Sequence, residues 1–230
     1  MRLDDLLDQI TAYNANADLD LVKKAYVFAA KAHEGQVRRS GEPYLVHPLA
    51  VASLLAEMHL DIPSIVAALL HDTAEDTEVT LEEIEKVFST EVRELVDGVT
   101  KLGKIKFNTS EAKQAENFRK MIMAMAKDVR VILIKIADRV HNMRTLEHLP
   151  EEKQILIAQE TLDLYAPIAN RLGIQEFKVE LEDLALKFLK PDVYRWIDEQ
   201  VRKRRDQRQK YIQQVIDLVK VKMKENGIDC

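Results

Sequence analysis

The sequence predicts an all-α fold. Only six glycines and six prolines occur in 230 residues, whereas leucine, alanine, glutamate and lysine, which favour helices, are abundant. Apolar residues recur with the helical period through most of the chain. With 47% hydrophobic residues, the chain is long enough to bury one sizeable core.

The apolar periodicity places the expected helices in order along the chain. We expect them near residues 3–14, 18–33, 48–58, 63–76, 80–87, 90–101, 112–126, 129–147, 151–166, 175–189 and 191–225. Between Ala32 and His47, two glycines and a proline interrupt the periodicity and predict a loop. Residues 103–111 also lack periodicity and predict a mobile loop beside the site.

Two of these helices need further justification. Residues 131–136 are rich in β-branched residues and would also suit a buried strand. We interpret them as helix, because the apolar pattern continues without a turn signal and Asp128 is a suitable N-cap. Pro167 is expected to end or kink the helix at 151–166.

The most informative motif is the pair His71-Asp72 at the inner end of an apolar helix, followed by Glu75 and Asp76. Residues four apart share a helix face, so one turn would carry an imidazole and three carboxylates. Such groups are costly to bury unless a cation neutralises them. They could instead be a core histidine and capping carboxylates, and this motif alone does not decide between the two interpretations.

Two further segments favour a buried site. His47 stands at a loop-to-helix junction, where the following proline suits the first helical turn and the imidazole can point inward. Asp138, Asn142 and Thr145 form a polar stripe on an otherwise apolar helix, which predicts a cavity wall rather than a solvated face. His141 is one step from this stripe and is expected to be structural.

The order His47, His71, Asp72 and Asp138 resembles the metal signature of the HD phosphohydrolase superfamily. The surrounding sequence motifs are more specific. They are AHEGQ (32–36), RSGEPY (39–44), HDTAEDT (71–77), DGVTKL (97–102), ADRVHNMRTL (137–146) and YAPIANRLG (165–173). Together they resemble the RelA/SpoT homologues, and within them the hydrolase domain for the alarmones ppGpp and pppGpp, over about residues 20–190. The resemblance implies an HD-type helical bundle with a long C-terminal linker helix.

The resemblance also implies a metal-dependent reaction. His47, His71, Asp72 and Asp138 would hold the metal, and this mixed nitrogen and oxygen set suits Mn, Fe, Zn or Co. The family's hydrolases are manganese enzymes, so Mn²⁺ is expected. The implied reaction removes the 3′-pyrophosphate of ppGpp or pppGpp, yields GDP or GTP plus pyrophosphate, and ends the stringent-response signal.

The remaining site residues follow from the same resemblance. Glu75 and Asp76 are the expected catalytic pair, which would orient water and move protons; helix-end capping is the alternative role for Asp76. The expected substrate-binding residues are Arg38, Arg39, Ser40, Asn142 and Thr145. Arginine suits such a site because its guanidinium can stack on a purine and bind phosphate. Many relatives carry lysine at the position of Arg39.

The chain is expected to comprise two parts. Residues 1–190 would form the hydrolase domain, and residues 191–230 a helical linker towards a synthetase domain outside this chain. The basic cluster at 202–205 is expected to be a solvated helix face. The expected partners are the guanine nucleotides and the synthetase and regulatory domains of a longer chain, with any ribosome contact made only through regions outside this one.

The expected location is cytoplasmic, without a membrane partner. No stretch approaches the roughly 20 apolar residues that span a bilayer, and the first residues lack the features of a secretory signal. The single cysteine, Cys230, can form no disulfide within the chain.

Two other functions compete with an active hydrolase. One is a catalytically inactive regulatory module, which in this family has lost the His-Asp pair or the acidic residues after it. The other is an HD nucleotidase or phosphodiesterase that acts on another substrate. Such an enzyme would lack the sequence motif between Arg38 and Tyr44. Both sets of residues are present here, so the sequence favours the active hydrolase.

Overall fold

The computed structural model describes residues 2–103, 119, 123 and 127–225. All regular elements in these residues are helical, apart from one isolated antiparallel bridge between Val37 and Pro43. The all-α prediction is therefore confirmed. By its internal contacts the chain divides into two units, Met1–Ala185 and Leu186–Cys230.

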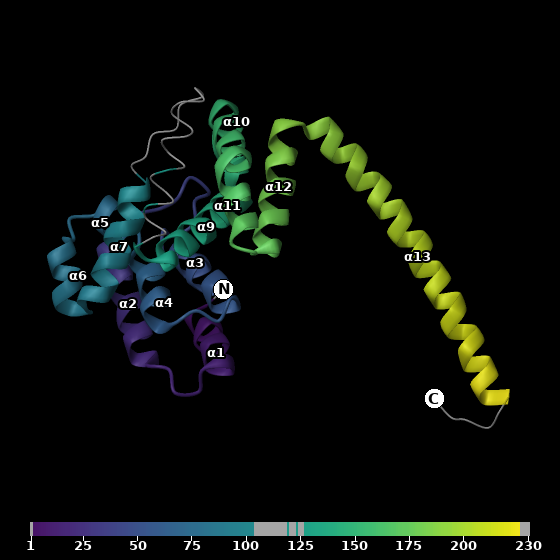
Figure 1. Cartoon of the computed structure of the whole chain (residues 1–230), viewed down its shortest axis with the longest axis horizontal. Helices are drawn as coiled ribbons and strands as arrows, with labels where there is room; N and C mark the ends of the chain where they lie inside the picture. Colours follow the sequence, from purple (N-terminus) through teal and green to yellow (C-terminus); the bar gives the residue numbers. More distant parts are fainter. Residues whose placement is uncertain (1, 104–118, 120–122, 124–126, 226–230) are drawn as a thin grey trace. The chain divides into compact units, whose positions relative to one another are not determined.

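The helices of the first unit follow the chain from purple to green in Figure 1. They are α1 (Leu3–Tyr13), α2 (Leu19–Ala32), α3 (Val46–Glu57), α4 (Ile62–Leu70), α5 (Thr73–Asp76), α6 (Leu81–Val87), α7 (Thr90–Gly103), α9 (Val129–Arg144), α10 (Glu151–Glu160) and α11 (Ala166–Arg171). A 3-10 turn, η1 (Leu146–His148), and a π turn, η2 (Thr161–Tyr165), complete it. Helix α12 (Gln175–Leu189) crosses the boundary between the units, and α13 (Pro191–Glu225) belongs to the second unit.

Helix α4 is the centre of the core. It packs against α2, α3, α7 and α9, and every residue from 64 to 70 is buried. A helix that is apolar on all sides has to be covered on all sides. Its start is well defined, because the Asp61 carboxylate accepts a hydrogen bond from the Ser64 N–H and a proline occupies the first turn.

Helix α9 also lies inside the bundle, between α3 and α7. Its N-cap is Asp128 as predicted, with the carboxylate accepting from the Arg130 N–H over 2.9 Å. Gly98 lets α7 pack closely against α9, because a Cβ at position 98 would lie only 2.8 Å from Cγ2 of Val131 on α9. The segment that could have been a strand is therefore a buried helix.

The prediction of one continuous helix over 63–76 is wrong. Helix α4 ends at Leu70, and the short helix α5 begins at Thr73. The His71 imidazole contacts the Ala68 carbonyl, the group that would accept from Asp72 in a continuing helix, and thereby competes with the backbone. The His-Asp pair therefore lies on a turn, not on a helix face.

The helix predicted at 151–166 is also interrupted, but before Pro167. Helix α10 ends at Glu160, and the chain continues as the π turn, in which the Ala166 N–H donates to the Thr161 carbonyl. Pro167 then occupies the first turn of α11, where its missing N–H costs little.

Some predictions fall on residues that the structure does not describe. The predicted loop at 103–111, apart from Gly103, lies outside the described residues, as does most of the predicted helix at 112–126. Within the part that is described, no helix combines the length and the apolar character needed to cross a bilayer.

Candidate metal centre

A short hairpin before α3 sets the positions of Arg38 and His47. The Arg38 N–H donates to the Glu42 carbonyl and the Gly41 N–H to the Arg38 carbonyl, each over 2.9 Å. Gly41 has a φ of 84°, a conformation that favours glycine. His47 follows in the first turn of α3 and is 2% exposed. The Arg38 guanidinium reaches α9, where it donates to the Asn142 side-chain carbonyl over 3.0 Å.

One ring nitrogen of His71 has a hydrogen-bond partner, and the other has none among the described residues. Its Nδ1 lies 2.8 Å from the Ala68 carbonyl oxygen, so Nδ1 carries the proton in the neutral ring. Its Nε2 is buried and has no hydrogen-bond partner among the described residues. The nearest carboxylate oxygen, Oδ1 of Asp72, is 3.1 Å away but is not in hydrogen-bonding geometry. An unpaired buried nitrogen of this kind is unusual and calls for a ligand.

Asp138 is held in place by two residues on its own helix. Lys135 donates to Oδ2 over 2.7 Å, and the Asn142 amide donates to Oδ1 over 2.6 Å. These residues are three before and four after Asp138, so all three share one face of α9. The carboxylate therefore faces α3 and α4 in a fixed orientation.

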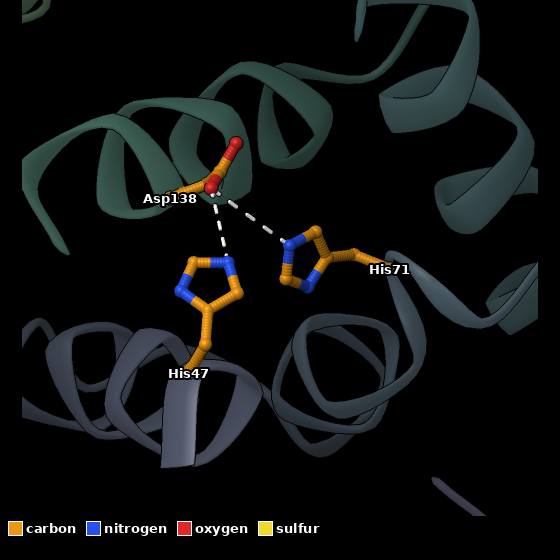
Figure 2. A group of neighbouring side chains, drawn as sticks. All are labelled: His47, His71 and Asp138. Atoms are coloured by element: carbon orange, nitrogen blue, oxygen red, sulfur yellow. Dashed lines mark ion pairs between the residues drawn. The ribbon is translucent and has the colours of Figure 1, made fainter. Parts of the chain in front are cut away.

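His47, His71 and Asp138 come from three separate segments and point toward one another (Figure 2). The Asp138 Oδ1 lies 3.2 Å from Nε2 of His47 and 3.9 Å from Nε2 of His71. All three are buried, and their potential ligand atoms lie within 4.8 Å of one another. Asp72 adjoins them, with Oδ2 3.5 Å from Nε2 of His47.

The charges in this cluster compensate one another. Burial tends to lower the pKa of His71, but the carboxylates of Asp72 and Asp138 outweigh it and raise the pKa to about 9. Burial would raise the pKa of Asp138, yet the Lys135 ammonium and the imidazoles hold it well below its usual range. Burial lowers the pKa of His47, so that ring is neutral.

The donor set fits a divalent cation. Two imidazole nitrogens and the carboxylates converge without a thiolate, a combination that suits first-row metals. The unpaired Nε2 of His71 gives independent support, because a cation would supply the missing partner. Asp72 is not a member of the group formed by His47, His71 and Asp138. Its carboxylate nevertheless lies close to both imidazoles.

The predicted catalytic pair lies on α5. The Tyr44 hydroxyl lies 2.6 Å from Oδ2 of Asp76 and 2.8 Å from Oδ2 of Asp72, so it links the two carboxylates. Tyr44 also stacks on His33, with ring centroids 4.3 Å apart. The side chain of Glu75 is exposed and makes no hydrogen bond or ion pair within the described part of the chain.

A cavity of about 520 Å³ adjoins the cluster. All five residues predicted to bind the substrate line it, together with Tyr44, Lys135, Asp138, Arg139 and Glu160. The cavity therefore connects a residue of the metal cluster with the hairpin before α3. It is far too small for a macromolecule and falls in the size range of small-molecule sites.

Four of the five predicted substrate-binding residues make side-chain hydrogen bonds in this structure. The Asn142 side chain bridges Arg38 and Asp138. The Thr145 hydroxyl donates to the His141 carbonyl over 3.2 Å, and the Ser40 hydroxyl donates to Glu42 over 3.2 Å. The Arg39 side chain is exposed.

Four site residues were not predicted from the sequence, or not in this role. Tyr44 and Lys135 each precede a predicted ligand by three residues, and Tyr44 is also the last residue of the motif RSGEPY (39–44). Arg139 pairs with Glu160 and lies over the ring of Tyr165, 4.1 Å from its centroid. His141, expected to be structural, contacts both His47 and Arg38.

Comparison with known proteins identifies the domain family that contains these residues. The sequence model of the HD domain family matches residues 25–175, a range that contains all the predicted site residues. A solved structure described as a metazoan ortholog of SpoT that hydrolyzes ppGpp is also similar. It is 27% identical, has a TM-score of 0.53, and the match covers 71% of this chain and 93% of that one.

The curated relatives are much longer than this chain. A protein named GTP pyrophosphokinase from Myxococcus xanthus is 57% identical over 95% of this chain, which corresponds to 29% of that protein. The bifunctional (p)ppGpp synthase/hydrolase SpoT of Escherichia coli K12 is 50% identical over 100% of this chain and 33% of its own length. The chain thus spans about a third of the length of these relatives.

Proposed function

Since the chain belongs to the HD domain family, within the group of the RelA/SpoT homologues, we propose that it hydrolyses the 3′-pyrophosphate of ppGpp and pppGpp. The products are GDP or GTP and pyrophosphate, and the reaction ends a stringent-response signal. The observation that carries the proposal is the buried His47, His71 and Asp138 cluster with its unpaired nitrogen beside a small cavity.

The proposed metal is Mn²⁺, held by His47, His71, Asp72 and Asp138. When bound, such a cation supplies a Lewis acid that lowers the pKa of water and offsets charge on the phosphoryl oxygens. The protein's part is to orient both imidazoles and the carboxylates before the cation arrives. Lys135 and Asn142 do this for Asp138, and the Ala68 carbonyl does it for His71.

Glu75 and Asp76 are proposed to orient the attacking water and to move its proton. Both side chains are exposed, but the Asp76 carboxylate accepts a hydrogen bond from the Tyr44 hydroxyl, whereas Glu75 makes no hydrogen bond or ion pair within the described residues. Glu75, whose carboxylate has no partner to displace, is therefore the better candidate for a base that exchanges protons with solvent. Asp76, joined through Tyr44 to Asp72, is the better candidate for holding the geometry.

The guanine nucleotide is proposed to bind in the cavity beside this cluster, through Arg38, Arg39, Ser40, Asn142 and Thr145. The positive charge needed by a polyanion comes first from Arg38 and Arg39, because Lys135 and Arg139 are already paired with carboxylates. Arg38 is held by Asn142 but uses only part of its five donors, which leaves N–H groups for phosphate.

One incubation tests the proposed reaction. Purified protein is mixed with Mn²⁺ and ppGpp, and the products are separated. Pyrophosphate with GDP is the expected result, whereas release of orthophosphate or no turnover would contradict the proposal. The intact set of acidic residues and histidines disfavours an inactive regulatory module.

The context of this domain is also a proposal. Residues 1–190 are proposed to be the hydrolase domain and residues 191–230 a linker towards a synthetase domain of a longer, cytoplasmic protein. The similarity to two proteins of roughly threefold length, one with the word synthase in its name and the other named a pyrophosphokinase, supports this organisation.

Binding of Mn²⁺ is expected to release a proton from His71. The facing carboxylates raise the pKa of His71 to about 9 against the opposing effect of burial, so the metal-free ring is largely protonated at neutral pH. A ligand imidazole must be neutral. Apparent affinity should therefore fall as the pH is lowered from about 9, and calorimetry in buffers of different ionisation enthalpy measures the released protons. Binding without proton release would contradict this prediction.

Replacing Arg38 with alanine is expected to raise KM for ppGpp roughly tenfold or more at saturating Mn²⁺, with a smaller change in kcat. The change removes a cation that can stack on guanine and pair with phosphate. Steady-state kinetics at two salt concentrations check it, because the salt dependence of binding should weaken as well. An unchanged KM at low salt would remove the hairpin residues 38–40 from the nucleotide site and leave the metal cluster untouched.

A further inference from the structure

Two imidazole nitrogens face each other beside the candidate metal cluster. Nδ1 of His47 lies 2.8 Å from Nδ1 of His141, and both rings are buried. A hydrogen bond of this length between two ring nitrogens needs one proton, carried by one ring and accepted by the other. Geometry between the two rings alone allows either direction.

The direction matters because it decides which nitrogen of His47 is free. If His47 donates from Nδ1, its Nε2 keeps a lone pair, and Nε2 is the atom that faces Asp138 and Asp72 at 3.2 and 3.5 Å. If His141 donates instead, the proton of His47 moves to Nε2. In the absence of a cation, the carboxylates of Asp138 and Asp72 favour this second arrangement, because they can accept the proton on Nε2. An Nε2 that carries a proton cannot bind a metal.

Arg38 removes the ambiguity. Its Nη1 lies 3.1 Å from Nδ1 of His141, and a guanidinium can only donate. Nδ1 of His141 must therefore be an acceptor, and the proton of the contact between the rings must belong to His47. The other end of the guanidinium is fixed by the Asn142 carbonyl, whose amide group is in turn oriented by Asp138.

We propose that Arg38 and His141 are positioning residues for the metal: together they hold His47 in the tautomer whose Nε2 can bind a cation, before any nucleotide is present. This role rests on the proposed metal site and adds to the nucleotide role of Arg38. Groups that hydrogen-bond to metal-binding histidines commonly fix their tautomer, and losing one typically costs 10–100-fold in metal affinity.

The decisive measurement is the Kd for Mn²⁺ of the nucleotide-free protein, by calorimetry. Arg38→Met is expected to weaken binding roughly 10–100-fold. Simple electrostatics predicts the opposite sign, since removing a nearby positive charge should favour a cation. Arg39→Met is the matched control: it removes the same charge from the same hairpin. The exposed Arg39 side chain makes no hydrogen bond or ion pair with His141 in the described part of the chain, so the Kd of this variant should not increase.

Substitutions at His141 provide a second test. His141→Leu removes the acceptor and should weaken Mn²⁺ binding by a similar factor, whereas His141→Asn places a side-chain carbonyl near the lost Nδ1 and should retain most of the affinity. Equal loss in both variants would indicate a packing role and overturn the proposal, as would unchanged binding in Arg38→Met. If the unmodified protein binds no Mn²⁺, the metal site itself fails.

The tautomer can also be observed without a variant and without metal. In protein labelled with ¹⁵N at histidine, the ring nitrogens of His47 should show a proton on Nδ1 and none on Nε2. Arg38→Met should shift that proton toward Nε2. A proton on Nε2 of His47 in the unmodified, metal-free protein would overturn the proposal even if every variant misfolded.

Discussion

Asp138→Ala is expected to abolish hydrolysis of ppGpp and to lower metal occupancy, while the helical fold is kept. The Asp138 Oδ1 faces both imidazoles, at 3.2 and 3.9 Å from their Nε2 atoms. Without it the remaining ligands hold a cation poorly. Elemental analysis of the purified variant measures occupancy, and product separation after incubation with Mn²⁺ and ppGpp measures turnover.

The same substitution should also lower stability, for a reason unrelated to the metal. Lys135 is nearly buried and donates to Oδ2 of Asp138 over 2.7 Å, so the alanine variant leaves a buried cation without its carboxylate. Breaking a buried pair in this way costs about 3–5 kcal/mol. The double variant Lys135→Met with Asp138→Ala removes that unpaired charge and should recover much of the free energy of unfolding without recovering metal.

This pair of variants separates folding from chemistry. Denaturant unfolding gives the stability of each protein, and circular dichroism reports its helix content. Full metal stoichiometry in either variant would show that Asp138 is not a ligand. His71→Ala should likewise lose metal and turnover, because it removes the one buried ring nitrogen that has no partner within the described residues.

The sequence predicted the helices well where apolar periodicity was strong, and failed where side chains compete with the backbone. The helix predicted at 129–147 is observed as α9, which ends at Arg144, because its apolar pattern and its N-cap agree. The break between α4 and α5 was missed, since apolar periodicity cannot show that an imidazole will contact the carbonyl three residues earlier. That break replaces the predicted helical face of His71 and Asp72 with a turn, and it directs His71 to the cluster.

The candidate site shows a similar division. Resemblance supplied His47, His71 and Asp138, and the structure brings these three together. The contacts that orient these three residues could not be predicted from the sequence. The sequence predicts a structural role for His141, and no spacing rule predicts that its ring nitrogen lies 2.8 Å from that of His47, 94 residues away. Tyr44 likewise joins Asp72 and Asp76 only because the hairpin before α3 folds over α5.

Glu75→Gln is expected to lower the rate of hydrolysis by roughly 10²–10⁴ while Mn²⁺ and nucleotide affinity persist. Glutamine keeps the size and much of the hydrogen-bonding capacity of the side chain but cannot accept a proton. Because Glu75 is exposed and makes no hydrogen bond or ion pair within the described part of the chain, the change should leave stability almost unaltered. A slow variant with normal stability and normal metal content would therefore point to chemistry and not to folding.

Glu78→Gln is the matched control for this prediction. Glu78 is another exposed carboxylate, three residues further along the chain and beyond the end of α5, so its loss removes the same charge from the same region. If the two variants slow hydrolysis equally, the effect is one of general electrostatics and Glu75 is not the base. If only Glu75→Gln is slow, single-turnover measurements at saturating ppGpp and Mn²⁺ should show the loss in the chemical step. Near-normal turnover of Glu75→Gln would leave Asp76, held by Tyr44 at 2.6 Å, as the remaining carboxylate able to move the proton.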